Sequence, residues 1–187
     1  MLVNRKAKRT ETTRHQKHVN TPIEATSPAS AQATGRNIMP LLVILRVYLG
    51  VILFITNFGK LFRDEPFTAE MLGFLNGVTT RRASAPYLHF IQQVVVPNAK
   101  LFSYLIMTGE ALAAISLLTG TMTRLGAAIA MFLFLNYMLA KGRMFWSPDS
   151  EDAAVFFIAL VVFLGRAGRL WGIDSCLAKR WPNSALW

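Results

Sequence analysis

The sequence predicts an all-α membrane protein built as a bundle of four spanning helices, and three observations carry this prediction. Of 187 residues 53% are hydrophobic, yet the formal net charge is +10, a combination that is rare in soluble domains and ordinary where apolar spans alternate with basic flanks. Four stretches are apolar over about 20 residues, the length that crosses a bilayer. One of them, residues 101–120, carries Glu110 at its centre, and a carboxylate in lipid costs several kcal/mol unless it is paired, neutralised or hydrated. We therefore expect a polytopic membrane protein with a polar feature inside it.

Residues 1–37 precede the first span and show no apolar periodicity. They are rich in Thr, Ser, Ala and Pro, and the first 36 contain seven of the 20 Lys and Arg residues. Such a segment cannot bury enough apolar surface to offset its chain entropy, so we expect a disordered cytoplasmic arm; a cleaved transit peptide is the alternative. A basic arm can bind nucleic acid, but contact with an anionic lipid surface or an acidic partner is the simpler use. No nucleic-acid partner is expected.

The four spans are expected to form a bundle over residues 38–175. The first covers residues 40–62, about 23 residues or ~34 Å of helix at 1.5 Å per residue. The others cover residues 99–119, 122–141 and 152–171, and a tail follows at 176–187. Four crossings place both termini on one side. The excess of Lys and Arg on that side predicts that both ends are cytoplasmic, in a bacterial or archaeal cytoplasmic membrane.

Between the first two spans, apolar residues recur at helical spacing instead of forming a free loop. Phe67, Met71, Phe74 and Val78 are four, three and four residues apart. Pro86 opens a second apolar segment, which contains Tyr87, Phe90, Ile91, Val94 and Val95. These patterns predict short amphipathic helices at the outer interface. They either cap the bundle or form a lid over a substrate pocket.

Polar residues inside the spans are the candidate functional residues. Arg46, Asn57 and Lys60 share one face of the first span with Gly50. The rise per residue puts Arg46 ~9 Å and Glu110 ~14 Å from the inner boundary, so we expect an Arg46–Glu110 ion pair. It is either a clasp that fixes helix register or part of a ligand site. Small residues at positions 109, 113, 126 and 130 predict close packing of the second and third spans.

Few residues could ligate a metal or a redox cofactor. Cys176 is the only cysteine, and it is either inert or lipidated; His15 and His18 lie in the arm and His89 in the segment between spans. An internal disulfide, a cysteine-held iron–sulfur cluster or a haem ligand within a span is therefore not expected from this chain alone. No metal site is predicted. If the protein moves electrons, a diffusible carrier or a partner subunit must hold them.

The order of several short motifs resembles the DoxX/DoxD-like membrane proteins, which include the small subunit of thiosulfate:quinone oxidoreductase. The matching residues run from Arg46 to Asp174, and they are Arg46, Gly59, Lys60, Pro97, Asn98, Gly109, Glu110, Gly120, Arg124, Asn136, Tyr137, Gly168, Trp171 and Asp174. The resemblance implies a four-helix bundle. For the DoxD branch it also implies oxidation of thiosulfate to tetrathionate with electrons passed to a membrane quinone. The DoxD enzyme works with a second, DoxA-type subunit or fused domain, so other membrane subunits are expected partners.

Under that resemblance the candidate residues take roles. Glu110 and Arg46 are the candidate catalytic residues, with Glu110 handling protons. A diffusible quinone would need an apolar slot with hydrogen-bonding groups, for which the candidates are Asn57, Asn136 and Tyr137. The thiosulfate dianion would need cations at an outer mouth, for which the candidates are Lys60, Lys141 and Arg143. The competing hypothesis is a non-catalytic accessory or scaffold subunit that packs against a larger membrane complex.

Overall fold

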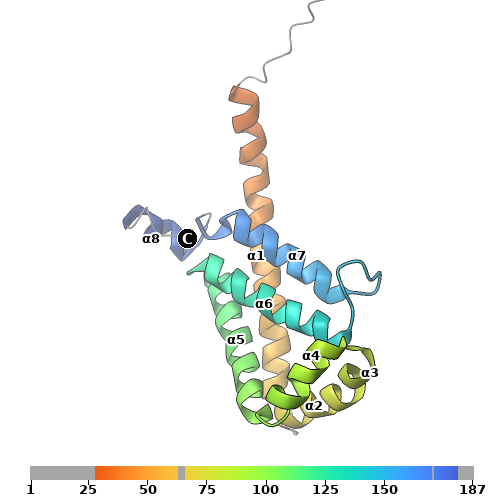
Figure 1. Ribbon diagram of the computed structural model, residues 1–187. Helices are drawn as coiled ribbons and strands as arrows, with labels where there is room; N and C mark the ends of the chain where they lie inside the picture. The colour runs from red at the N-terminus through yellow and green to blue at the C-terminus, as the bar shows by residue number, and fades with distance from the viewer. Residues whose placement is uncertain (1–27, 63–65, 170, 181–187) are drawn as a thin grey trace, which may run out of the picture. The chain divides into compact units, whose positions relative to one another are not determined.

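The computed structural model describes residues 28–62, 66–169 and 171–180, and all regular structure within these ranges is helical. Figure 1 shows the helices, which are α1 (Pro28–Leu61), α2 (Phe67–Phe74), the π-helical turn η1 (Leu75–Thr79), α3 (Thr80–Arg82), α4 (Ala85–Phe90), the π-helical turn η2 (Ile91–Val95), α5 (Ala99–Thr119), α6 (Thr123–Lys141), α7 (Glu151–Leu164), the 3₁₀ turn η3 (Ala167–Arg169) and α8 (Ile173–Arg180). The chain divides into two units, residues 1–36 and 37–187.

Three of the predicted spans are confirmed as helices long and apolar enough to cross a membrane. They cover Pro40–Leu61 of α1, Ala99–Thr119 and Thr123–Lys141. The fourth predicted span, 152–171, is wrong as one continuous helix. Helix α7 has 14 residues, or ~21 Å, which is shorter than the ~30 Å of a bilayer core. It ends at Gly165, and the backbone beyond it turns through positive φ at Arg166 and Trp171.

The predicted arm falls largely on residues 1–27, which lie outside the described residues. Its last residues, from Pro28 on, belong to α1, which continues through Pro40 without interruption. At the other end, α8 covers the first part of the predicted tail, and residues 181–187 are outside the described part of the chain.

Small residues bring the spans close together around one apolar core. A Cβ added to Gly50 would lie 2.9 Å from the Cγ atom of Leu118, so α1 and α5 are in close contact there. Gly109 faces Leu133 of α6, and Gly126 faces Ser116 of α5, which confirms the predicted close packing of these two helices. The core itself contains mainly Leu and Ala side chains: Leu49, Leu53, Ala113, Ala114, Leu117, Ala127, Ala130, Phe134, Ala159, Val162 and Ala167. Its last members show that α7 packs against α6, as Figure 1 also shows.

The segment between α1 and α5, residues 66–98, forms the short helices that the periodicity predicts, with a shifted buried face. Met71, Leu75, Ile91 and Val95 are buried against Ala99 at the start of α5. Phe74 and Val78, which the α-helical spacing assigns to the same face as Met71, are less buried. The reason is the π-helical turn η1, whose wider turn moves the inward position from residue 78 to residue 79. We call residues 66–98 the cap segment.

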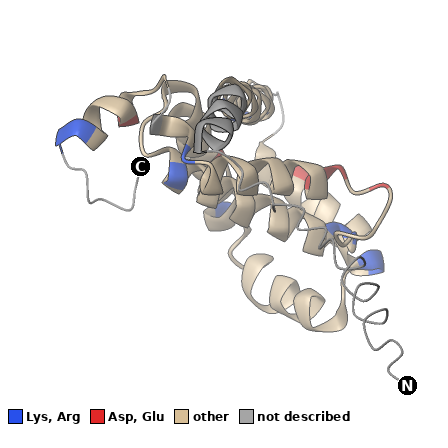
Figure 2. Cartoon of the chain, turned by 90° about the horizontal axis from the view of Figure 1, so that it is seen from above, with Lys and Arg blue, Asp and Glu red and all other residues tan. Residues whose placement is uncertain are grey.

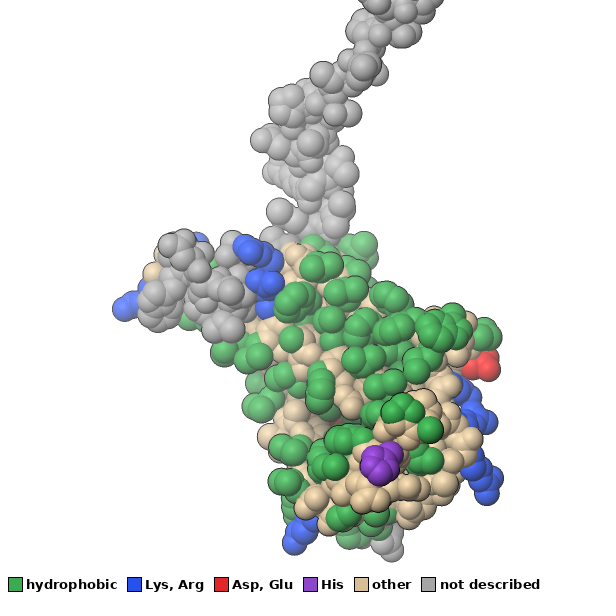
Figure 3. Space-filling view, viewed as in Figure 1, with side chains coloured by type: hydrophobic (Ala, Val, Ile, Leu, Met, Phe, Trp, Pro, Cys, Tyr) green, Lys and Arg blue, Asp and Glu red, His purple; other side chains and the backbone are tan. Residues whose placement is uncertain are grey.

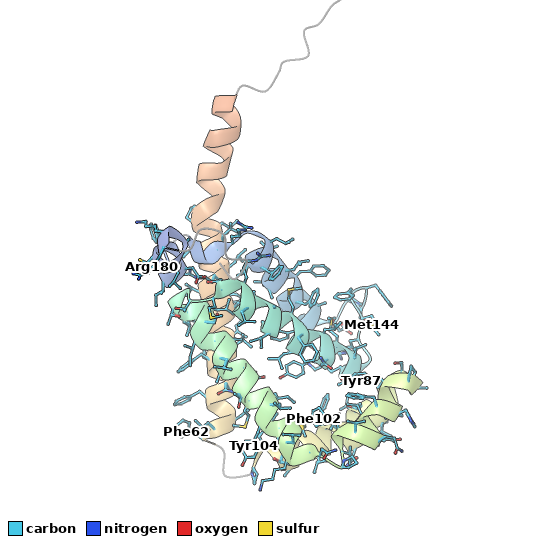
Figure 4. All side chains as sticks on the ribbon, turned by 60° about the vertical axis from the view of Figure 1, so that its left-hand side comes forward. Phe62, Tyr87, Phe102, Tyr104, Met144 and Arg180 are labelled. Atoms are coloured by element: carbon cyan, nitrogen blue, oxygen red, sulfur yellow. The ribbon has the colours of Figure 1, made fainter. Side chains whose placement is uncertain are left out.

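The cap segment is fastened to the spans by side-chain hydrogen bonds. The hydroxyl oxygens of Thr68 and Ser103 are 2.7 Å apart, which joins α2 to α5. The Tyr87 hydroxyl donates to the backbone carbonyl and the side-chain oxygen of Asn136, each at 3.2 Å, which joins α4 to α6. Burial raises the pKa of the Tyr87 phenol above its ordinary value. Figure 4 shows Tyr87 and Phe102 among the side chains around the cap segment.

Large apolar side chains cover the outer faces of α1 and α5. They include Ile44, Phe54, Ile55, Phe58, Leu61, Leu101, Tyr104, Leu105, Leu112 and Ile115. Figure 3 shows hydrophobic side chains over much of the visible surface of the described residues, and Figure 2 shows several Lys, Arg, Asp and Glu residues on helix ends and connecting segments. A continuous apolar surface of this kind is typical of contact with lipid. The protein is therefore an integral membrane protein.

Candidate functional site

Three helices bring three polar side chains together around the carboxylate of Glu110, and we call Asn57, Lys60, Glu110 and Tyr137 the polar cluster. The Lys60 ammonium group donates to both oxygens of Glu110, at 2.6 and 2.7 Å. The Tyr137 hydroxyl donates to Oε1 of the same carboxylate at 2.6 Å. Asn57 donates from Nδ2 to the Met107 carbonyl at 2.7 Å and to Oε2 of Glu110 at 3.5 Å.

Helical spacing and small residues explain how these side chains meet. Asn57 and Lys60 are three residues apart and therefore share the face of α1 that meets α5. Gly109, beside Glu110, leaves room for α6 to approach, and this closeness lets Tyr137 reach the carboxylate. Phe67 of the cap segment lies with its ring centroid 4.7 Å from the Lys60 ammonium. The aromatic ring both covers the cation and stabilises its charge.

Burial makes the cluster an unusual environment for charge. Glu110 is 2% exposed, whereas the Lys60 side chain is 17% exposed. The carboxylate is thus inside the bundle, and the ammonium group is at its edge. An ammonium has three N–H donors, and the contacts with Glu110 use two. Protons can pass between the Lys60 ammonium, the Glu110 carboxylate and the Tyr137 phenol, because the carboxylate accepts a hydrogen bond from each of the other two groups.

The predicted Arg46–Glu110 ion pair is wrong, because Arg46, near the middle of α1, belongs to a second buried group. Its guanidinium donates to the carbonyls of Ala167 and Trp171, both at 3.1 Å, and lies close enough to Asp174 for their charges to interact. Asp174, which is fully buried, accepts hydrogen bonds from the backbone N–H groups of Met122 and Thr123 at 2.6 and 2.8 Å. It thereby caps the N-terminus of α6. We call this the Arg46–Asp174 clasp.

The error lay in the assumed register of α1 against α5. The depth estimate set Pro40 level with Thr119, whereas the structure packs Gly50 on Leu118. The difference is about nine residues, or ~14 Å of helix. Because of this shift, Glu110 is level with the stretch that contains Asn57 and Lys60, and Arg46 is level with the turn between α5 and α6.

The remaining predicted residues do not join the polar cluster. Asn136 accepts from Tyr87 and donates to the Phe132 carbonyl. Lys141 forms an ion pair with Asp152 at 2.7 Å, and Arg143 donates to the backbone carbonyl of Asp149. The cations predicted for one outer mouth are therefore divided, since Lys60 lies in the cluster whereas Lys141 and Arg143 line a separate hollow.

Sequence reasoning missed the partners of these residues. The sequence pattern places Tyr87 on an apolar face and predicts none of its hydrogen bonds, and Arg81 and Arg82, which share the hollow with Arg143, are not among the predicted site residues. The available signal is the pair of consecutive arginines between the apolar segments of residues 67–78 and 86–95. Within the described ranges, no group of three or more His, Cys, Asp or Glu residues could hold a metal ion.

Comparison with known families places the chain. The sequence model of the DoxX family matches residues 41–142. The chain belongs to the DoxX family. The matched range contains α1 from Leu41 on, the cap segment, α5 and α6, and so the whole polar cluster, whereas Asp174 of the clasp lies beyond it. No curated protein and no solved structure matches the chain.

Proposed function

We propose that this DoxX-family protein is a quinone-linked redox subunit whose polar cluster supplies and accepts protons next to a bound quinone. The observation that carries the proposal is the Glu110 carboxylate, which is buried within an apolar span and in hydrogen-bond contact with both Lys60 and Tyr137. A buried ionisable group in a span is expensive to keep, so a functional role is its default explanation. The resemblance to the DoxD branch adds the electron donor, thiosulfate, which would be oxidised to tetrathionate.

The donors of the cluster fit a quinone carbonyl. Lys60 has an N–H beyond the two that meet Glu110, its side chain is partly exposed, and the Phe67 ring lies beside it. A carbonyl oxygen at that edge would accept from Lys60, with the flat quinone ring against apolar and aromatic side chains. Two thiosulfate ions that join through a new sulfur–sulfur bond release two electrons. Quinone takes up these electrons together with two protons, which would pass through Lys60, Glu110 and Tyr137.

Purified protein in mild detergent, together with any subunits that co-purify, tests this proposal. Thiosulfate-dependent reduction of a quinone analogue should fall at least about tenfold in Glu110→Gln, because the buried carboxylate is lost, and less in Tyr137→Phe, which leaves the carboxylate and its contacts with Lys60 in place. Glu151→Gln and Tyr104→Phe are matched controls, since both residues are exposed, and they should keep the wild-type rate. A folded Glu110→Gln protein with the wild-type rate would refute the proton-handling role.

A non-catalytic accessory subunit is the second candidate, and the full pairing of Glu110 favours it. A carboxylate that already accepts hydrogen bonds from Lys60, Tyr137 and Asn57 also holds the helices α1, α5 and α6 together. This function predicts that redox subunits co-purify and that the isolated chain reduces no quinone. It also predicts that Glu110→Gln weakens the complex only in proportion to its loss of thermal stability.

For topology, we propose that α7 and the turn η3 after it together cross the membrane and complete a four-helix bundle, with both ends of the chain in the cytoplasm of a bacterium or archaeon. The Lys and Arg residues of the N-terminal arm support this orientation. A reporter that is active only outside the cytoplasm, fused after Trp187, should remain inactive. Activity of that reporter would reverse the orientation.

A further inference from the structure

A basic hollow lies between the cap segment and the end of α6, apart from the polar cluster. Its volume is about 550 Å³, and its lining consists of Phe74, Gly77, Val78, Arg81, Arg82, Lys141 and Arg143. Four of these residues are cationic, and no acidic residue is part of the lining. Lys60 is not among them, so the hollow and the polar cluster can be tested separately.

The cations of the hollow differ in their partners. Lys141 is paired with Asp152, and Arg143 is tethered by a hydrogen bond of 2.7 Å to the carbonyl oxygen of Asp149. Arg81 and Arg82 are exposed and, among the residues that the structure describes, they form no ion pair. Several like charges in one hollow repel each other, and a bound anion would relieve that repulsion.

Backbone packing holds the arginines where they are. Gly142, which ends α6, has a φ of 61°, and a Cβ there would overlap the backbone carbonyl of Arg82. The chain of α3 therefore lies directly against the end of α6. This contact places Arg81 and Arg82 at the same hollow as Arg143. Because the backbone already holds these residues there, an anion that binds would cause a smaller loss of conformational entropy.

We infer that the basic hollow binds a tetrahedral oxyanion of the phosphate class. Guanidinium groups present paired N–H donors that match two oxygens of such an anion, and the hollow contains three of them. Large exposed apolar residues follow Arg143 closely, namely Phe145 and Trp146, and exposed tryptophan is typical of the headgroup level of a membrane. The oxyanion is either the phosphate of an anionic lipid headgroup or a free ion.

The first test removes the charges. Wild-type protein and an Arg81→Gln/Arg82→Gln variant in detergent are titrated with phosphatidylglycerol, phosphatidylcholine and inorganic phosphate, and lipid or ion binding is measured by native mass spectrometry and by the shift of the melting temperature. Lys179→Gln/Arg180→Gln removes two neighbouring cations from α8 and is the matched control. The N-terminal arm is present in every variant, so its own attraction for anions cancels in the comparison.

We expect the affinity for the anion to fall at least about tenfold in the Arg81/Arg82 variant and to stay within about twofold of the wild type in the control. Arginine-dependent binding of phosphatidylglycerol without binding of inorganic phosphate identifies a lipid headgroup. Arginine-dependent binding of inorganic phosphate identifies a free ion. Equal binding by the wild type and the Arg81/Arg82 variant for all three probes overturns the inference.

A second test fills the hollow and leaves its charges in place. A Cβ added to Gly77 would meet no atom within 4 Å, so Gly77→Leu places its side chain in open space at the hollow. Gly73 is one turn earlier, is equally open and does not line the hollow, so Gly73→Leu is the matched control. We expect Gly77→Leu to lose arginine-dependent binding and Gly73→Leu to keep it. Wild-type affinity in a folded Gly77→Leu protein would place the anion elsewhere and refute the site.

Discussion

Removal of the Lys60 ammonium should destabilise the protein far more than removal of both members of its ion pair. In Lys60→Met the chain keeps similar length and apolar contacts, but the Glu110 carboxylate, 2% exposed, loses the cation that contacts both its oxygens. Leaving one charge of a buried pair uncompensated costs about 3–5 kcal/mol. Because the Lys60 side chain is 17% exposed, water can reach its position, and we expect the lower end of that range.

The double variant Lys60→Met/Glu110→Leu removes the orphaned charge as well. It should recover most of the lost stability, because apolar replacement of a buried ion pair is close to neutral. Tyr137 and Asn57 then each lose an acceptor, which limits the recovery by about 1–2 kcal/mol. The double-mutant cycle isolates the coupling between Lys60 and Glu110, which we expect to be at least about 2 kcal/mol.

Thermal unfolding in detergent, followed by circular dichroism, measures these differences. For a chain of this size 1 kcal/mol corresponds to about 2–4 °C in melting temperature, so Lys60→Met should melt ~6–12 °C below the wild type. Lys100→Met, which removes an exposed lysine, is the control and should melt within ~2 °C of the wild type. If the stability losses of Lys60→Met and Glu110→Leu add up to the loss of the double variant, the two residues are not coupled and the ion pair does not contribute as described.

Three further predictions concern the clasp and the cap segment. Asp174→Asn should lower the melting temperature by several degrees, because its amide replaces one of the two oxygens that cap α6. Asp149→Asn, at an exposed site, is the control and should leave the melting temperature nearly unchanged. Equal melting temperatures of the two variants would contradict the clasp. Gly168→Ala should destabilise the protein strongly, because its Cβ would overlap the Asp174 carboxylate. Gly73→Ala has open space around the new Cβ and should be neutral or stabilising by up to about 1 kcal/mol. Urea unfolding measures both variants, and the reverse order of their stabilities would contradict this packing. Burial raises the pKa of Tyr87 in the folded protein, so its stabilising contribution is complete below about pH 10 and is lost as the pH rises through the folded pKa. The melting temperature of the wild type should therefore fall more steeply above about pH 10 than that of Tyr87→Phe. Parallel curves of melting temperature against pH would contradict this prediction.

Sequence reasoning located the helices and the polar residues within them better than it located the contacts between those residues. Apolar length alone was enough for α5 and α6, because a span must satisfy its backbone internally and so must be a continuous helix. It overestimated α7, which ends at Leu164, just before Gly165 and Arg166. In the cap segment, the π-helical turn η1 changed the phase of the buried face, and side-chain periodicity carries no signal for such a turn.

For the candidate site, residue types were predictable and contacts were not. Asn57, Lys60, Glu110 and Tyr137 stood out because polar groups in apolar spans are few. Which of them touch depends on the sliding of α1 along α5, and a single contact, Gly50 against Leu118, sets that register. The hollow around Arg81 was out of reach for a different reason, because it forms only where α3 meets the end of α6.

The Arg46–Asp174 clasp has a consequence for biogenesis. The ribosome makes Arg46 long before Asp174, so the first helix enters the membrane with its guanidinium still lacking the later segment that receives it. Asp174 also caps α6, so this link between α1 and α6 forms only when the chain is nearly complete. A nascent chain halted before Ala167 would thus hold Arg46 without the two carbonyls and the carboxylate that surround its guanidinium in the folded protein.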